Sequence, residues 1–270
     1  MSGWHHVSAS VIGTRHLRDG FPCQDSSTCV VLPTKEGKEV LVAIVSDGAS
    51  SASKSEIGSA LVCNSFIVEI QKFLEKGFDF KKIDASFTKT WLARVKNEIT
   101  LRAAALKIKT REFACTTLAM VSDDRGATVL QIGDGAIVYS MESAPSDFKV
   151  AIWPQEGEYA NTTWFITELG ALEKLEILHI EGRIARIAIF SDGIQRLALS
   201  FSTKAAFPPF FQPLFAHLET SPEKSTLATE LKSFLGSPQI NGRTDDDKSL
   251  ILASRHPFRS SQKTKNHEII

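Results

Sequence analysis

Short stretches of alternating or continuous hydrophobic positions along the chain predict β-strands. The clearest is 40–45, six consecutive apolar residues, which predicts a strand buried on both faces. Further strands are predicted at 6–12, 27–32, 115–121, 127–132, 136–141, 183–190 and 249–253. The segments 115–121, 127–132 and 136–141 are joined by short turns rich in Gly and Asp, so we expect them to form an antiparallel meander.

Two long amphipathic helices are predicted between the third and fourth strands. The first covers 54–76, and the second covers 87–108, where large apolar residues recur every four positions. Residues 204–234 predict two further helical pieces, interrupted by prolines at 208, 209, 213 and 222. Segment 13–25 is interpreted as a polar loop, and 141–182 shows no clear pattern. Runs of strands followed by runs of helices favour an α+β layered domain over a parallel sheet.

Composition and charge narrow the class of protein. The 270 residues are 43% hydrophobic and 23% charged, which predicts one globular domain over 1–253. The longest apolar run has six residues, whereas a membrane span needs about 20, and the first residues lack the pattern of a signal peptide. Lys+Arg and Asp+Glu both number 31, which argues against a nucleic-acid partner. We therefore expect a cytoplasmic protein that binds neither nucleic acid nor membrane.

Two features outside the main pattern have simple interpretations. Residues 254–270 are polar, with four basic residues against one acidic residue, and predict a flexible basic tail. The four cysteines form no CxxC pair, which predicts reduced, structural thiols.

Two predicted strands end in the same tripeptide, Ser-Asp-Gly, at Asp47 and at Asp192. Asp-Gly is a common turn sequence, and a hairpin turn accounts for Asp134, which lies between two predicted strands. It accounts less well for Asp47 and Asp192, because the residues that follow them are serine-rich or helical. An aspartate at the end of a rigid strand can bind an ion, and the carbonyl of Gly48 can approach the same ion closely.

Two more acidic clusters flank predicted strands. Asp25 lies just before the second strand, and Asp246 belongs to three consecutive aspartates before the last one. Carboxylates at strand ends without a cluster of His or Cys favour Mg²⁺ or Mn²⁺ over zinc. Glycine-rich phosphate loops and a GxSxG motif are absent from the sequence, so Ser46 and Ser191 are interpreted as hydrogen-bonding residues and not as nucleophiles.

Taken in order, these segments resemble the metal-dependent protein phosphatases of the protein phosphatase 2C type. The matching motifs are Gln24-Asp25-Ser26, Ser46-Asp47-Gly48-Ala49, Thr116-Thr117 followed by Gly133-Asp134-Gly135, Ser191-Asp192-Gly193 and Asp246-Asp247-Lys248-Ser249. The stretch 157–163 resembles the bacterial branch. The resemblance implies a four-layer α/β/β/α sandwich of two antiparallel sheets flanked by helices, with a site for two Mn²⁺ or Mg²⁺ ions at one end. It also implies hydrolysis of phosphoserine and phosphothreonine in a phosphoprotein substrate, a cognate kinase as a possible partner, and a monomer.

The resemblance also assigns roles to the catalytic aspartates. Asp47 would bridge both metals and the Gly48 carbonyl would bind one of them. Asp192 and Asp246 would bind the other, and Asp25 would order water on the metals.

The sequence departs from the family pattern at several positions. Gly20 stands where the family has its phosphate-binding arginine, so Arg15, His16 and Arg18 are the candidates for that role, with His16 preferred. A third-metal aspartate has no clear counterpart near 111–114, where Glu112 is a weak substitute, and Ala49 replaces a histidine that some relatives use as a proton donor. Two alternatives stay open: an inactive relative that regulates a kinase, and a hydrolase of small phosphate esters.

Overall fold

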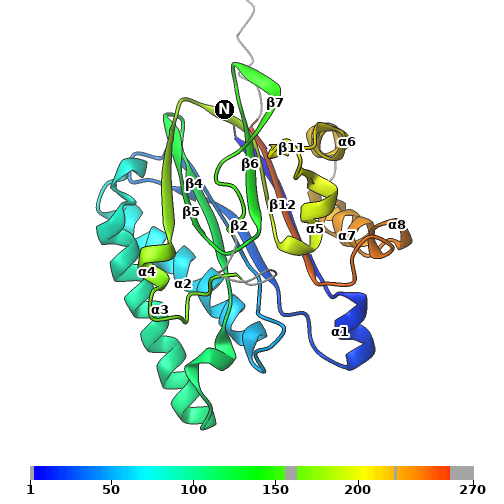
Figure 1. The fold of residues 1–270 in the computed structure, drawn as a ribbon. Coiled ribbons are helices and arrows are strands. Elements are labelled where there is room, and N and C mark those ends of the chain that lie inside the picture. The colour runs from blue at the N-terminus through cyan, green and yellow to red at the C-terminus, as the bar shows by residue number, and fades with distance from the viewer. Residues whose placement is uncertain (1–2, 156–162, 222–223, 256–270) are drawn as a thin grey trace, which may run out of the picture.

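Two five-stranded antiparallel sheets lie face to face in the computed structural model, which describes residues 3–155, 163–221 and 224–255 (Figure 1). One sheet has the order β1 (Trp4–Val11), β12 (Lys248–Arg255), β9 (Ile184–Phe190), β6 (Ala136–Met141), β7 (Ala144–Val150). The other has the order β2 (Ser26–Pro33), β3 (Glu39–Ser46), β4 (Thr117–Ser122), β5 (Gly126–Ile132), β8 (Glu176–Glu181). A short pair, β10 (Leu199–Ser200) and β11 (Ala205–Ala206), forms a separate two-stranded sheet.

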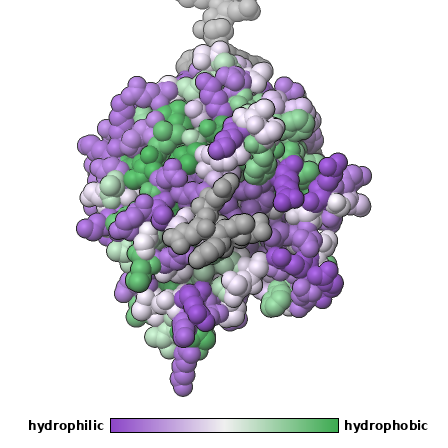
Figure 2. Space-filling view, viewed as in Figure 1, coloured by the Kyte–Doolittle hydropathy of each residue, from purple (hydrophilic) through white to green (hydrophobic). Residues whose placement is uncertain are grey.

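Helices cover the outer faces of the two sheets. The sheet that contains β3 is covered by α2 (Ser55–Glu75) and α3 (Ala85–Leu106), and the sheet that contains β12 by α5 (Asp192–Ala198), α6 (Pro208–Thr220) and α7 (Lys224–Leu235). A third apolar cluster fills the space between the sheets. The predicted four-layer α+β sandwich is thus confirmed. On the face seen in Figure 2, polar residues predominate and apolar ones form separate groups.

The remaining helical segments are short. They are α1 (Thr14–Asp19), α4 (Ala171–Lys174) and α8 (Pro238–Asn241), with 3₁₀ turns at Phe80–Lys82 and Thr110–Phe113.

Helix α2 is long and apolar enough to span a membrane by length and composition alone. Its side chains Val62, Phe66 and Ile70 are fully buried in the cluster that also contains β3. A core helix satisfies the same length and composition criteria as a membrane span, and these contacts identify α2 as a core helix.

The predicted meander is wrong at its last connection. β4 and β5 pair as expected, but β6 pairs with β9 in the other sheet, with Ile137 opposite Ile189. The turn at 133–135 therefore crosses from one sheet to the other and is not a hairpin. A short Gly/Asp connection serves both geometries, so the local sequence does not distinguish them.

Several other boundaries differ from the prediction. The loop expected at 13–25 contains α1, and Pro213 lies inside α6, where the missing N–H removes only one helical hydrogen bond. The interval 141–182 contains β7, α4 and β8. The predicted break at Pro222 and nearly all of the stretch 157–163 lie outside the described residues.

The start of the predicted tail also needs correction. β12 continues through Ser254 and Arg255, which pair with His5 and Trp4 of β1. Arg255 is buried and donates hydrogen bonds to the carbonyls of Ile184 (3.1 Å) and Asp123 (2.8 Å). The domain therefore extends to residue 255, and the rest of the predicted tail lies outside the described residues.

Candidate active site

The strand ends that carry the predicted aspartates meet at one edge of the sandwich. In one sheet Ser26 pairs with Ser46, so Asp25 and Asp47 both lie one residue beyond the same end of this ladder. In the other sheet Phe190 pairs with both Leu250 and Ala136, so the segments before β12, after β9 and before β6 share one edge. The topology thus brings together residues that are far apart in the sequence.

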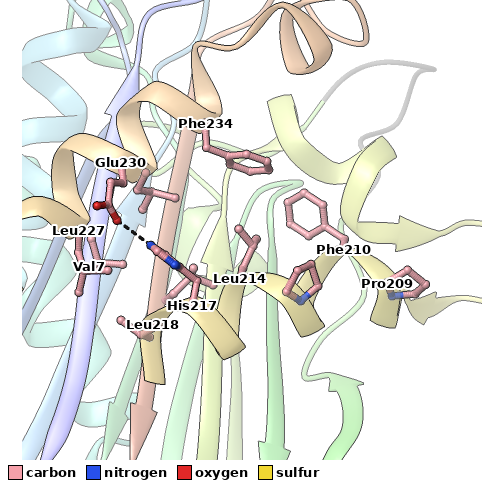
Figure 3. A pocket seen from close by; sticks show the side chains of 12 residues that line it. Val7, Pro209, Phe210, Leu214, His217, Leu218, Leu227, Glu230 and Phe234 are labelled. Atoms are coloured by element: carbon pink, nitrogen blue, oxygen red, sulfur yellow. Dashed lines mark hydrogen bonds and ion pairs between the residues drawn. The ribbon is translucent and has the colours of Figure 1, made fainter. Parts of the chain in front are cut away.

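A polar cavity of about 610 Å³ lies at this edge. It is lined by Arg15, Asp47, Gly48, Ala49, Ser50, Ser51, Thr116, Asp134, Thr163, Phe165, Glu168, Asp192 and Asp246. A second cavity, of about 530 Å³, opens between α6 and α7 and is lined mainly by Leu, Phe and Pro side chains (Figure 3). Its polar side chains are His217 and Glu230, which pair with each other at 2.6 Å. The carboxylates identify the first cavity as the candidate active site.

The backbone around Asp47 is fixed by the neighbouring strand. The N–H of Asp47 donates to the hydroxyl of Thr116 (3.0 Å), and the N–H of Thr116 donates to the carbonyl of Asp47 (2.8 Å). Gly48 forms a bridge with Cys115, and a Cβ at Gly48 would lie 2.6 Å from the carbonyl oxygen of Gln24. Only glycine therefore fits this close approach.

Asp25 is buried beside the cavity, and the cavity-lining residues do not include it. Its carboxylate accepts a hydrogen bond from the hydroxyl of Ser191 (2.7 Å), which in turn accepts one from the N–H of Ser249 (2.9 Å). This chain of hydrogen bonds connects the two sheets next to the cavity.

Burial and mutual repulsion raise the pKa values of the carboxyl groups at the site. Burial is the main cause in every case, and nearby aspartates add to it. The pKa values of Asp25 and Asp134 rise to about 7, that of Asp47 lies well above its usual value, and that of Asp192 is also raised. Asp47 and Asp192 are within hydrogen-bonding reach of each other. Such a cluster must bind either protons or cations in the folded protein.

The oxygen-only donor set fits a hard divalent cation such as Mg²⁺ or Mn²⁺. Within the described ranges, three His, Cys, Asp or Glu side chains do not come close enough to form a complete ion site by themselves. Water and backbone carbonyls would therefore have to complete the coordination, as is usual for Mg²⁺.

The structure separates Arg15 from His16, two of the candidates for phosphate binding. Arg15 lines the cavity, where its guanidinium contacts Ser50 Oγ (2.9 Å) and Asp246 Oδ1 (3.2 Å). His16 is 3% exposed and does not line the cavity; its Nδ1 lies 2.9 Å from Asp247 Oδ2. This placement supports Arg15 and does not support a phosphate contact by His16.

Asp134 belongs to one of the motifs that carry the family resemblance, but the sequence reasoning assigned it no role in the site. It lines the cavity between β5 and β6, where a hairpin residue had been expected. The signal was present in the Gly-Asp-Gly sequence at a strand end, the same signal that identified Asp47. Glu112, the weak substitute for a third-metal ligand, instead accepts a hydrogen bond from the N–H of Ser53 (3.1 Å).

A β-sandwich with helices on both faces and an acidic, oxygen-lined cavity at one end defines a protein suited to bind divalent cations. A family model described as protein phosphatase 2C matches residues 12–236. The serine/threonine-protein phosphatase 3 of Escherichia coli K12 is 36% identical over 252 residues, covering 93% of this chain and 98% of the relative. The chain belongs to the protein phosphatase 2C family, which is metal-dependent in general.

Solved structures show the same fold at low sequence identity. The phosphatase Stp1 of Staphylococcus aureus superposes with a TM-score of 0.61 at 11% identity, covering 95% of this chain and 96% of the other. The serine/threonine phosphatase of S. agalactiae gives a TM-score of 0.59 at 14% identity, covering 94% of this chain and 100% of the other.

Proposed function

We propose that this protein is a protein serine/threonine phosphatase that uses two divalent cations, Mn²⁺ or Mg²⁺. The observation that carries the proposal is the cluster of partly buried carboxylates around Asp47 and Asp192, which line the cavity at one end of the sandwich. Family membership and the name of the E. coli relative support the reaction class.

The charge of the cavity explains why cations are needed. Several carboxylates line it, and Arg15 is its single basic residue in the described part of the chain. A phosphate dianion would be repelled by such a surface. Bound divalent cations would neutralise the phosphate and activate a water molecule for in-line attack. Asp47 and the carbonyl of Gly48 would bind them from one sheet, and Asp192 and Asp246 from the other.

The remaining side chains of the site would bind the substrate phosphate, orient water or add to the cation-binding surface. Arg15 is placed to bind the phosphate oxygens with its planar guanidinium. Asp25, held in one orientation by Ser191 beside the cavity, would order water bound to the cations and so orient it for attack. Asp134 adds a further carboxylate to the cation-binding surface.

The proposed substrates are phosphoserine and phosphothreonine in proteins, and the proposed setting is the cytoplasm, with a cognate kinase as the opposing enzyme. A regulatory relative without activity would not need this cluster of partly buried carboxylates, because their crowding destabilises the fold unless their charge is neutralised. A hydrolase of small phosphate esters would use the same chemistry, so it is tested directly.

The test is hydrolysis of matched phosphoserine and phosphothreonine peptides, compared with sugar phosphates, in Mn²⁺, Mg²⁺ or excess EDTA. We expect hydrolysis of the peptides that depends on the cation and is abolished by EDTA. Preference for the sugar phosphates would support the small-ester alternative. Absence of turnover with every cation would support the regulatory alternative.

A further inference from the structure

Asp247, in the loop before β12, connects this loop to helix α1 and to the segment before β2, beside the cavity. One carboxylate oxygen accepts a hydrogen bond from the N–H of Gly13 (2.6 Å), and the other accepts one from the N–H of Gln24 (2.6 Å). The second oxygen also lies 2.9 Å from Nδ1 of His16. Both side chains of this last contact are almost fully buried, at 4% and 3% exposure.

Helix α1 has a single buried side chain that could fix its position. It has six residues, its N-cap residue is Gly13, which has no side chain that could cap the helix, and His16 is its one buried residue. Leu17 is 66% exposed. Because a helix this short is not stable by itself in water, its position depends on the contacts that anchor it.

Helix α1 also lies against the loop at 244–247, which carries Asp246 and Asp247. The N–H of Arg15 donates to the carbonyl of Asp245 (3.0 Å). A Cβ at Gly13 would lie 2.3 Å from the carbonyl carbon of Asp246, so the two backbones are in direct contact. The guanidinium of Arg15 therefore reaches the cavity from a helix that is held by these backbone contacts at its start and, one residue later, by the contact of the His16 side chain with Asp247.

We propose that His16 and Asp247 are positioning residues: their buried contact fixes α1 so that Arg15 points into the active-site cavity. The inference rests on the proposed function, because it assigns Arg15 to the substrate phosphate. A buried polar pair of this kind adds little stability compared with apolar residues of the same size. Its benefit here is a defined orientation, since an apolar side chain at position 16 could pack in several ways.

The experiment is a double-mutant cycle between His16 and Arg15. The variants are R15A, H16A and the double variant, with L17A as a matched control on the exposed side of the same helix. The measurements are the KM and kcat for a small phosphate ester in saturating Mn²⁺, and the binding of inorganic phosphate by calorimetry. A thermal melt over a range of Mn²⁺ concentrations reports folding and cation binding separately.

We expect R15A and H16A each to weaken phosphate binding by about tenfold or more, the range of a lost charged hydrogen bond. In the R15A background, H16A should change phosphate binding by less than about twofold, because its effect passes through Arg15. The Mn²⁺ dependence of the melt should be the same in H16A as in the wild type, and L17A should bind phosphate normally. H16N, which can place an amide N–H near the position of Nδ1, should restore most of the affinity.

An H16A effect that is equally large with and without Arg15 would overturn the proposal, as would unchanged phosphate binding in H16A. If H16A does not fold, H16N and D247N take its place in the same cycle. A wild-type protein that binds phosphate but hydrolyses no ester would contradict the proposed function, while the cycle in phosphate binding would still decide the positioning role. A wild-type protein that does not bind phosphate would overturn both.

Discussion

Asp47 lies among three other carboxylates, those of Asp25, Asp192 and Asp134, and all of them raise its pKa in addition to burial. In the folded protein without cations, this aspartate is therefore held in an environment that disfavours its charge. An aspartate in such surroundings is suited to bind a cation, because the cation neutralises its negative charge.

We expect D47N and D192N to lower cation-dependent phosphatase activity by orders of magnitude, because each removes one charged ligand from the shared site. Their melting temperatures in EDTA should be equal to or higher than that of the wild type, since one repulsion is removed, at roughly 2–4 °C per kcal/mol for a protein of this size. D147N is the matched control: Asp147 is on β7 and exposed, and its variant should keep full activity. Activity of D47N or D192N close to that of the wild type would contradict the assignment.

Asp134 provides a second test at the level of single residues. Because its carboxyl group lines the cavity and has a pKa of about 7, D134N should lower activity and weaken Mn²⁺ binding by about 10–100-fold, the range seen when residues that support a metal site are lost. A Mn²⁺ titration followed by both activity and thermal melting measures this. Unchanged Mn²⁺ dependence would mean that Asp134 only fills the cavity wall.

At the scale of elements, β12 has two functions at its two ends. Its first residues follow Asp246 and Asp247 at the cavity, and its last residues pack at the opposite end of the sandwich. There the guanidinium of Arg255 lies 4.2 Å from the ring centre of Trp4 and pairs with Asp124 at 2.5 Å. Loss of the end of this strand would therefore affect stability without touching the site directly.

We expect a chain that ends at residue 255 to match the 270-residue chain in melting temperature and in activity on a small phosphate ester. A chain that ends at residue 253 lacks Arg255 and leaves the buried carbonyls of Asp123 and Ile184 without their donor. It should be less stable by roughly 3 kcal/mol, on the scale of the charged hydrogen bonds that are lost. Parallel thermal melts and ester assays on the three chains provide the measurement. Equal stability of the two shortened chains would show that Arg255 contributes nothing.

The structure also shows which elements the sequence could predict and which it could not. Strand β3 and helices α2 and α3 were predictable because long, regular apolar patterns define them within one or two residues. Helix α1 was not, because its single buried residue is a histidine whose partner, Asp247, is more than 200 residues away in the sequence. The crossing at 133–135 was missed for a related reason: the choice between a hairpin and a crossover depends on β9, which lies later in the chain.

At the scale of the whole molecule, the raised carboxyl pKa values couple stability to pH. An aspartate whose pKa is higher in the folded state binds its proton more tightly there than in the unfolded chain. Its contribution to stability is therefore complete at a pH below the unfolded value of about 3.9 and is lost as the pH rises through the folded value. For Asp25 and Asp134 the folded value is about 7, so this loss extends from about pH 4 to above pH 7.

Divalent cations should reverse this loss, because they bind the deprotonated carboxylates of the folded state. We expect the increase in melting temperature caused by Mg²⁺ to be larger at pH 8 than at pH 5.5. In D134N, which lacks one of the shifted groups, the difference between the two pH values should be smaller. Melts with Mg²⁺ and with EDTA at both pH values test this. An increase that is the same at pH 5.5 and pH 8 would show that protons and cations do not compete for the same groups.

The strand order has a consequence for how the protein is made in the cell. β1 is the first strand of the chain, yet its partner in the sheet is β12, the last one described, which also separates it from β9. During synthesis, β1 must therefore wait until β12 has been made before it can pair, and Asp246 and Asp247 are added only just before β12. Contacts between such distant segments form slowly. A nascent or prematurely terminated chain that stops before β12 lacks both this strand and part of the cavity, so it contains no functioning site, and activity can begin only after β12 has been synthesised.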